Sequence, residues 1–229
     1  MLRQFQEFFL PHFCVLCHEQ TFCEKDLCAK CKNDLPIIKS ACKVCAKPLS
    51  AKEKICGTCL VTPPPFARTV ALFQYQTPID YLITALKFSH KLVHAEIIGQ
   101  LLTTKLMEVY QKEPLPEVII PVPLHKARLE NRGFNQALEI ARPISKQLKI
   151  PIDKSSCMRI LQTSPQAKLA AKERHHNIKN AFAIIKPIVY QHIAVIDDVV
   201  TTGNTVRELC QTLMSAQAMI IDVWCFARA

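Results

Sequence analysis

The stretch from Ala194 to Thr205, with the sequence AVIDDVVTTGNT, constrains the fold more than any other part of the chain. An apolar run that begins near Ile193 ends in two adjacent acids, and such a run is typical of a buried strand in a parallel sheet. A turn rich in threonine follows, and a helical apolar pattern begins at once. Backbone N–H groups therefore converge at a helix N-terminus beside two carboxylates, which is a suitable place for an anion.

The chemistry that suits this arrangement is that of a ribose phosphate. Asp197 and Asp198 stand at the carboxyl end of the strand, where ligands bind in open α/β sheets. They are candidates to accept hydrogen bonds from the 2′- and 3′-hydroxyls of the ribose. An N-capping turn with solvated acids is the alternative interpretation. The candidates to bind the 5′-phosphate are Thr201, Thr202, Gly203, Asn204 and Thr205.

A second motif is an array of cysteines with a fixed period. Eight of the twelve cysteines form four Cys-x-x-Cys pairs that recur every fourteen residues. Each pair directs two thiolates at one ion, and two pairs complete a closed four-sulfur zinc site. The array therefore predicts two structural Zn²⁺ ions, whose binding would supply folding free energy to segments with few apolar residues. The predicted ligands are Cys14, Cys17, Cys28, Cys31, Cys42, Cys45, Cys56 and Cys59.

Equal gaps of ten residues leave the pairing of these four knuckles open. Sequential, nested and interleaved pairings all fit, and we favour the sequential one. Disulfide bonds are the main alternative to zinc, and the lack of a recognisable secretory signal argues against them. Cys23 falls outside the period, whereas Cys157, Cys210 and Cys225 lie in apolar patterns typical of core residues.

The distribution of motifs indicates two domains. The cysteine array ends in three consecutive prolines, 63–65, which form a stiff extended connector. We predict a double zinc ribbon with a short N-terminal helix over residues 1–62 and a larger domain over residues 66–229. In the larger domain strand patterns alternate with helical ones, which predicts an α/β fold with a mostly parallel, doubly wound sheet. The expected strands are 69–75, 117–121, 156–161, 181–185, 193–196 and 219–226, and the expected helices are 79–88, 95–110 and 136–148.

Positive charge is concentrated in the middle of the chain. Of a formal net charge of +10, a surplus of eight falls between Pro121 and Phe182, where there are twelve Lys and Arg and four Asp and Glu. Such a field attracts polyanions, for example a pyrophosphate or a nucleic-acid backbone. Solvated surface positions are the alternative. The residues predicted to form an anion-binding rim are Lys126, Arg128, Arg132, Lys168 and Arg174.

The predicted rim comes from two segments. Residues 121–136 follow a strand end, so they should lie at the same edge of the sheet as the two acids. Residues 159–182 form a long, polar and basic segment between two expected strands. The type I phosphoribosyltransferase fold, which this chain resembles through residues 194–205, carries at this position a lid that closes over the site and excludes water. A solvated helix with Lys168 and Arg174 facing water is the alternative.

Two resemblances follow from these motifs. The stretch 194–205 resembles the signature of the type I phosphoribosyltransferases, which is a hydrophobic strand, two acids and a TTG(x)T loop. Almost the whole chain resembles the ComF family, which includes the GntX-type proteins, through the cysteine knuckles, PVP with RGFNQ, QxxL…ER…N…AF and DDVxTTGxT. The second resemblance implies a double zinc ribbon joined to a type I phosphoribosyltransferase-like domain. It also implies a role in natural competence, in the cytoplasmic handling of single-stranded DNA during uptake.

The resemblances imply partners as well. They are Mg²⁺ with phosphoribosyl pyrophosphate or another ribose 5-phosphate ligand, single-stranded DNA, and other competence proteins at the inner membrane, such as a helicase or a DNA-processing protein. No stretch approaches the roughly 20 apolar residues of a membrane span. We therefore expect a cytoplasmic protein, or one that is peripheral at the inner membrane.

Three functions stay open: a phosphoribosyltransferase with a nitrogen acceptor, a handler of single-stranded DNA, and a sensor that binds phosphoribosyl pyrophosphate without turnover. Only twenty-four residues follow Thr205, enough for a helix and one strand. A C-terminal hood that grips a base is therefore not expected. Any hood must come from residues 66–110 or from the ribbons.

Overall fold

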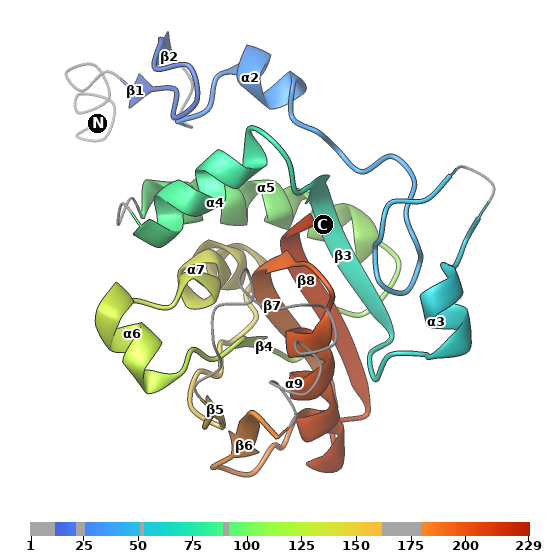
Figure 1. Cartoon of the computed structure of the whole chain (residues 1–229). Helices are drawn as coiled ribbons and strands as arrows, with labels where there is room; N and C mark the ends of the chain where they lie inside the picture. The colour runs from blue at the N-terminus through green and yellow to red at the C-terminus, as the bar shows by residue number, and fades with distance from the viewer. Residues whose placement is uncertain (1–11, 22–25, 51–52, 89–91, 162–179) are drawn as a thin grey trace.

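A parallel sheet of four strands forms the centre of the molecule (Figure 1). The computed structural model describes residues 12–21, 26–50, 53–88, 92–161 and 180–229. All pairings within this sheet are parallel, so the predicted parallel sheet is confirmed. In spatial order the strands are β3 (Arg68–Gln74), β8 (Ile220–Arg228), β7 (His192–Val200) and β4 (Val118–Pro121).

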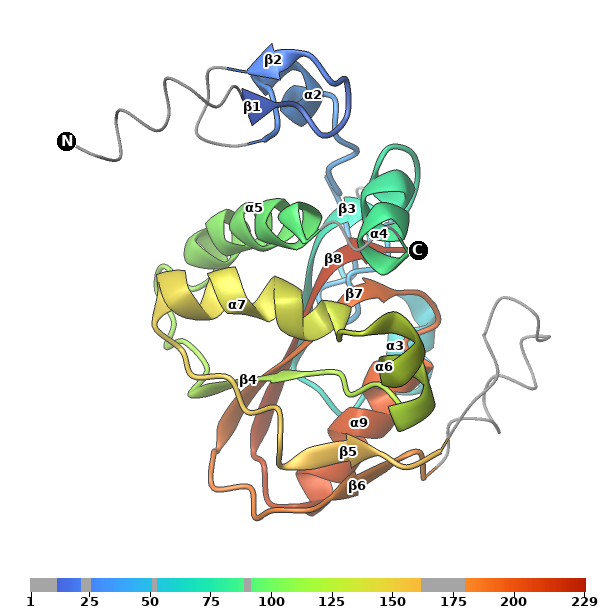
Figure 2. The ribbon, with the colours of Figure 1, turned by 90° about the vertical axis from the view of Figure 1, so that its left-hand side faces the viewer.

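Helices cover both faces of this sheet (Figure 2). Successive side chains of a strand point to opposite faces, so β7 contributes to two apolar clusters. Ala194 and Ile196 pack in the cluster that contains residues of α4, α5 and α7, whereas Ile193 and Val195 pack in the cluster that contains residues of α9. The sheet is therefore doubly wound, as predicted. The helices of this domain are α4 (Ile79–Phe88), α5 (Val93–Val109), α6 (Lys126–Arg132), α7 (Gln136–Leu148) and α9 (Asn204–Ser215).

Two short strands form a sheet of their own. β5 (Cys157–Arg159) and β6 (Phe182–Ile184) pair in antiparallel fashion. We expected strands at 156–161 and 181–185, and both positions contain one, but neither extends the central parallel sheet. The burial of β5 gives the reason: Met158 is exposed between two buried neighbours. One covered face is typical of antiparallel ribbons, whereas strands of a parallel sheet are covered on both.

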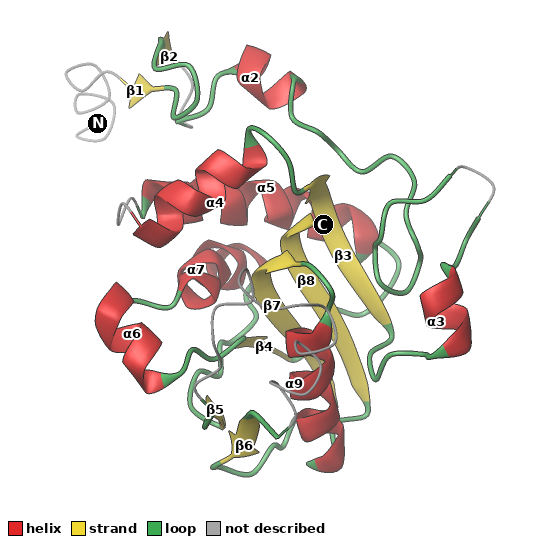
Figure 3. Ribbon diagram, in the orientation of Figure 1, coloured by secondary structure: helices red, strands yellow, loops and turns green. Residues whose placement is uncertain are grey.

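The cysteine-rich segment contains little regular structure (Figure 3). Part of it lies along the edge of the central sheet, because Gln74 N donates to Pro36 O at 2.9 Å and Ile38 N donates to Leu72 O at 3.2 Å. The two predicted domains are thus in contact, and the boundary at 63–65 stays a prediction. The short elements are β1 (His12–Phe13), β2 (Gln20–Thr21), α2 (Ala29–Asn33) and α3 (Gly57–Val61). None of the helices in the described ranges has the length and apolar character needed to cross a bilayer.

A buried acid joins three elements near the amino ends of the central strands. Asp222 of β8 is 1% exposed, and it accepts hydrogen bonds from Tyr110 Oη at 2.5 Å, His192 Nε2 at 3.1 Å and Arg68 Nε at 3.3 Å. Trp224 Nε1 donates to Tyr110 Oη at 3.0 Å. Burial and the Asp222 carboxylate raise the pKa of Tyr110, which keeps its hydroxyl protonated as a donor.

We expect Asp222→Ala to lower the free energy of unfolding by about 3–5 kcal/mol, because it leaves buried donors without their common acceptor. Urea denaturation monitored by circular dichroism measures this loss. Glu113→Gln is the matched control, since the Glu113 carboxylate also contacts Arg68, at 2.7 Å, but its side chain is 55% exposed. The control should change stability by less than about 1 kcal/mol. Equal losses in both variants would contradict a special role for the buried acid.

Candidate ligand cavity and zinc ribbons

A cavity of about 410 Å³ opens at the carboxyl ends of β4 and β7. Its lining comes from the loop after β4, from α6, from the end of α4 and from the segment that joins β7 to α9. The sequence motifs at 121–136 and 194–205 therefore meet at one place, as the topology of parallel strands requires. The predicted site residues that line it are Arg128, Arg132, Asp197, Asp198, Thr201, Thr202, Gly203, Asn204 and Thr205.

Of the other predicted rim residues, Lys126 is described by the structure and is not part of this lining. The Lys126 side chain is 86% exposed, and its Nζ lies 3.9 Å from Glu130 Oε1 on the outer side of α6. Lys168 and Arg174 fall outside the described residues, together with most of the predicted lid.

The turn between β7 and α9 forms one wall of the cavity. Gly203 caps the N-terminus of α9 with a φ of +81°, in the left-handed region that favours glycine. Val206, Leu209 and Leu213 anchor the helix on the sheet through its apolar stripe. The first residues of α9 line the cavity, so the positive end of the helix dipole borders it.

The two acids have different environments although they are adjacent. Asp198 is 4% exposed, and its Oδ2 forms an ion pair with Nζ of Lys87, near the end of α4. Asp197 accepts a hydrogen bond from the Asp198 backbone N–H at 2.9 Å. Burial and the neighbouring Asp198 carboxylate raise the pKa of Asp197 well above the ordinary value for an aspartate, and the positive charge of Lys87 only partly offsets this rise. The charged form of Asp197 thus needs a ligand or a cation that favours it.

Positive side chains from α6 and β5 border the same cavity. Arg159 is 7% exposed and its guanidinium lies 5.6 Å from the centre of the Phe182 ring. Burial lowers the pKa of Arg159, and the neighbouring Arg128 lowers it further, while Asp197 acts in the opposite direction. Burial and the nearby Arg132 likewise lower the pKa of Arg128. An anion in the cavity would relieve this repulsion between like charges.

Sequence reasoning missed several residues of the lining. Lys87 lies in a pattern that we interpreted only as a helix. Arg159 is the first residue of the segment predicted to form a lid, but it was not among the residues predicted to form the rim, although a charged residue inside an apolar strand pattern was a usable signal. Gln136, the first residue of α7, is 6% exposed, and its Oε1 accepts no hydrogen bond within the described part of the chain. The Asn135 before it caps α7 through Oδ1 and donates to Val122 O at 3.0 Å.

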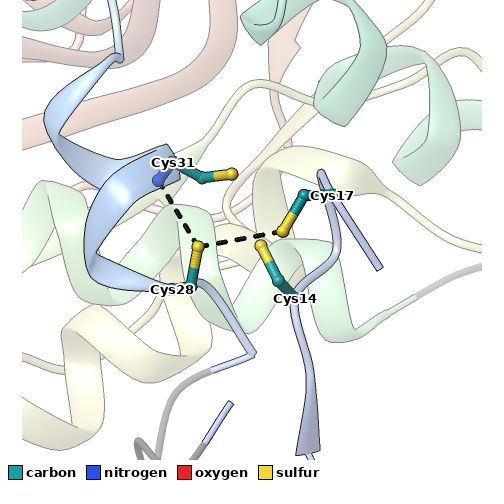
Figure 4. Close-up of side chains that lie close together, drawn as sticks. All are labelled: Cys14, Cys17, Cys28 and Cys31. Atoms are coloured by element: carbon teal, nitrogen blue, oxygen red, sulfur yellow. Dashed lines mark hydrogen bonds between the residues drawn. The ribbon is translucent and has the colours of Figure 1, made fainter. Parts of the chain in front are cut away.

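The eight periodic cysteines form two groups of four, and the sequential pairing is confirmed. The first group contains Cys14, Cys17, Cys28 and Cys31, whose side chains lie close together (Figure 4). The second contains Cys42, Cys45, Cys56 and Cys59. In each group the sulfur atoms lie within 4.8 Å of one another.

The geometry of both groups fits zinc rather than disulfide bonds. The Sγ atoms of Cys17 and Cys28 are 3.8 Å apart, and those of Cys45 and Cys56 are 3.6 Å apart. Four thiolates at about 2.3 Å from a tetrahedral Zn²⁺ would lie about 3.8 Å from one another, whereas an S–S bond is only about 2.05 Å long. Burial opposes ionisation of Cys14, but backbone N–H groups at Cys17 and Cys28 lower its pKa to about 6, which favours a thiolate ligand.

Comparison with known proteins agrees with this description. A protein-family model for the double zinc ribbon domain matches residues 5–60. The DNA utilization protein YhgH of Escherichia coli O157:H7 is 35% identical over 222 residues, which cover 96% of this chain and 98% of that protein. This chain belongs to the ComF and YhgH family. The competence protein F of Haemophilus influenzae is 32% identical over 222 residues, with 94% and 96% of the two chains covered. The resemblance to ComF proteins is thereby confirmed.

Solved structures similar to this ComF-family chain include phosphoribosyltransferases. An adenine phosphoribosyltransferase from Leishmania donovani is 14% identical, with a TM-score of 0.35 over 58% of this chain and 65% of that one. A purine phosphoribosyltransferase from Pyrococcus horikoshii is 18% identical, with a TM-score of 0.31 over 70% and 87% of the two chains.

We expect the purified protein to carry two zinc ions per chain and Cys31→Ser to carry one, because loss of one sulfur opens one tetrahedral site. Elemental analysis by mass spectrometry measures the content. Cys157→Ser, which removes a thiol outside both groups, should leave two. A wild-type content below two, in protein purified without chelator, would contradict the assignment.

The raised pKa of Asp197 predicts how stability depends on pH. As the pH rises above about 4, the unfolded chain ionises before the folded one does, so the folded state loses stability. Asp197→Asn removes this penalty, and it should raise the melting temperature at neutral pH and lose that advantage near pH 4.

Asp153→Asn is the control with the opposite sign. Hydrogen bonds from Ser156 and Ser155 outweigh the burial of Asp153 and lower its pKa. Its ionised form therefore stabilises the fold above the ordinary pKa of aspartate, and this stabilisation is lost as the pH falls through the lowered value. The asparagine variant should melt below wild type at neutral pH. Two variants that shift in the same direction would contradict the assignment for Asp197.

Proposed function

We propose that the cavity at the carboxyl ends of β4 and β7 binds the ribose 5-phosphate part of phosphoribosyl pyrophosphate, together with Mg²⁺. The observation that carries the proposal is that two acids, a helix N-terminus and arginines from separate elements line one cavity. Asp197 and Asp198 suit the ribose hydroxyls, and residues 201–205 suit the 5′-phosphate. Arg128 and Arg132 suit the pyrophosphate, since guanidinium groups bind phosphate oxygens in a bidentate manner.

The ion pair between Lys87 and Asp198 bears on how such a ligand would enter. Asp198 is buried, and its contact with Lys87 supplies the positive charge that an ionised buried carboxylate requires. The hydroxyl groups of a ribose would have to share the Asp198 carboxylate with Lys87 or displace the Lys87 ammonium group from it. Lysine has a flexible stem and a compact charge, so it can turn aside more easily than an arginine.

An active phosphoribosyltransferase is the alternative. In that reaction the bond from the anomeric carbon to pyrophosphate breaks, pyrophosphate leaves with the electron pair, and a nitrogen nucleophile forms the new bond and loses its proton. Positioning and electrostatic stabilisation would supply the rate. An acceptor needs a surface above the sugar, and Tyr75, Thr84 and Phe88 line the cavity from the segment 66–110. Two aromatic rings there favour a planar acceptor.

We infer that the biological role lies in the competence-related handling of DNA. The names of the relatives, DNA utilization protein and competence protein, support this inference. So does the net charge of +10 with its surplus at residues 121–182, because positive fields attract a nucleic-acid backbone. The partners we propose are single-stranded DNA and competence proteins, such as a helicase, on the cytoplasmic side of the inner membrane. A ligand-sensing role would combine ligand binding with DNA binding, because bound phosphoribosyl pyrophosphate would then alter the affinity of the protein for DNA.

Calorimetry of phosphoribosyl pyrophosphate with Mg²⁺ tests the ligand site. The double variant Asp197→Asn/Asp198→Asn should bind at least about 100-fold more weakly than wild type, because two hydrogen bonds to charged acceptors are lost. Asp153→Asn, an acid outside the cavity lining, should bind like wild type. A double variant with wild-type affinity would overturn the assignment of the two acids.

Three further measurements distinguish the three roles. Release of pyrophosphate in the presence of a panel of bases and amines would show turnover. Binding of a fluorescent single-stranded oligonucleotide that weakens with salt, and weakens further in Arg128→Glu/Arg132→Glu, would show DNA binding by the basic rim. A change in that DNA affinity on addition of phosphoribosyl pyrophosphate would show sensing.

A further inference from the structure

Arg228, near the end of β8, joins two parts of the molecule that are far apart in sequence. It is 6% exposed. Its Nε donates to the backbone carbonyl of Cys45, in the second cysteine group, at 2.9 Å. Its Nη1 donates to the carbonyl of Val200 at 3.0 Å and to that of Thr201. One buried guanidinium therefore bridges the second ribbon and the start of the turn 201–205.

A second arginine ties the other end of the same turn to the cysteine-rich segment. Arg207, in the first turn of α9, donates from Nη2 to Thr62 O and from Nη1 to Pro63 O, both at 3.3 Å. These carbonyls follow directly after α3, which contains the last zinc ligand, Cys59. The residues before the turn and the helix after it are thus both held from the side of the second ribbon.

The turn also separates two cavities. Thr201 and Thr202 line the candidate ligand cavity on one side. On the other side they line a smaller cavity of about 190 Å³, whose opposite wall includes Cys45, Cys56 and Cys59. The conformation of this wall therefore depends on contacts from the ribbon as well as on its own backbone.

The first cysteine group has a different environment. Cys14 is part of the large apolar cluster that also contains Leu35, Phe73 and Trp224. The buried residues of that cluster come from β3, α4, α5, α7 and neighbouring elements, and they do not include any residue of the turn 201–205. Variants of the first cysteine group can therefore serve as controls for variants of the second.

We propose that Arg228 is a positioning residue that couples the second zinc ribbon to the turn 201–205. Affinity for a 5′-phosphate then depends on the second cysteine group and not on the first; the affinity part of this proposal rests on the proposed function. The Cys45 carbonyl keeps its place while the knuckle around it is closed by four metal-binding thiolates. When the knuckle opens, Nε of Arg228 loses its acceptor in a buried place, and the guanidinium no longer holds the Val200 and Thr201 carbonyls.

Matched cysteine variants test the coupling. Cys17→Ser and Cys45→Ser each change the second cysteine of the leading knuckle of a group, and each should lose one zinc ion. We expect Cys45→Ser to bind phosphoribosyl pyrophosphate with Mg²⁺ about 5- to 150-fold more weakly than Cys17→Ser, the range typical of coupling between two sites. Equal affinities in calorimetry, with zinc contents of one in both proteins, would overturn the coupling.

Amide hydrogen exchange of residues 200–205 tests the same coupling without a ligand. Exchange should accelerate in Cys45→Ser and in Arg228→Met, stay at the wild-type rate in Cys17→Ser, and be intermediate in Arg228→Lys, which keeps the charge but cannot bridge both sides. Unchanged exchange in Cys45→Ser would refute the coupling through Arg228. If wild-type protein binds no phosphoribosyl pyrophosphate, the proposed function fails, and the exchange data still decide the coupling.

Discussion

The pairing of β7 with both of its neighbours is the interaction on which the rest of the structure depends. β7 pairs with β8 from His192 to Val200 on one side and with β4 from Ile193 to Ile196 on the other, in both cases in parallel. Parallel strands end at the same edge of a sheet, so this pairing brings the turn 201–205 together with the loop that follows Pro121. It also fixes the alternation by which β7 packs on helices at both faces. The composition of the cavity follows from that register.

Those parts of the molecule with local signals could be predicted from the sequence. The helices 79–88 and 136–148 begin and end as their apolar periodicity predicts, and the eight periodic cysteines are the members of the two four-sulfur groups. The equal gaps between the knuckles left their pairing open, and the tertiary structure shows that it is sequential. Lys87 and Arg228 could not be assigned in this way. Each makes its decisive contact with a residue remote in the chain, Asp198 for the first and Cys45 for the second. Such pairs depend on the tertiary arrangement, which no local pattern encodes.

The cavity combines two kinds of electrostatic stress. Burial and a like charge raise the pKa of Asp197, and burial with the neighbouring Arg128 lowers the pKa of Arg159. Both shifts show that the charged form of the side chain is disfavoured in its surroundings. Residues with strongly shifted pKa values are often found at functional sites. A ligand with hydroxyl donors at one end and phosphate oxygens at the other would stabilise the charged form of Asp197 with the first and the charged arginines with the second. This complementarity favours a phosphorylated sugar over a plain anion, which would satisfy only the arginines.

The two buried charged residues of β8 lie towards opposite ends of the strand and bind different parts of the molecule. Asp222, towards its amino end, is bonded to Arg68, Tyr110 and His192, which belong to the sheet and to the helix layer. Arg228, towards its carboxyl end, is bonded to the turn beside the cavity and to the second ribbon. The first network holds the fold together at the edge remote from the cavity. Among the described residues, the second reaches only backbone carbonyls, those of Cys45, Val200, Thr201 and Ala229. A backbone carbonyl is kept under any substitution, so the geometry of this network depends on the path of the backbone around Cys45 rather than on a particular partner side chain.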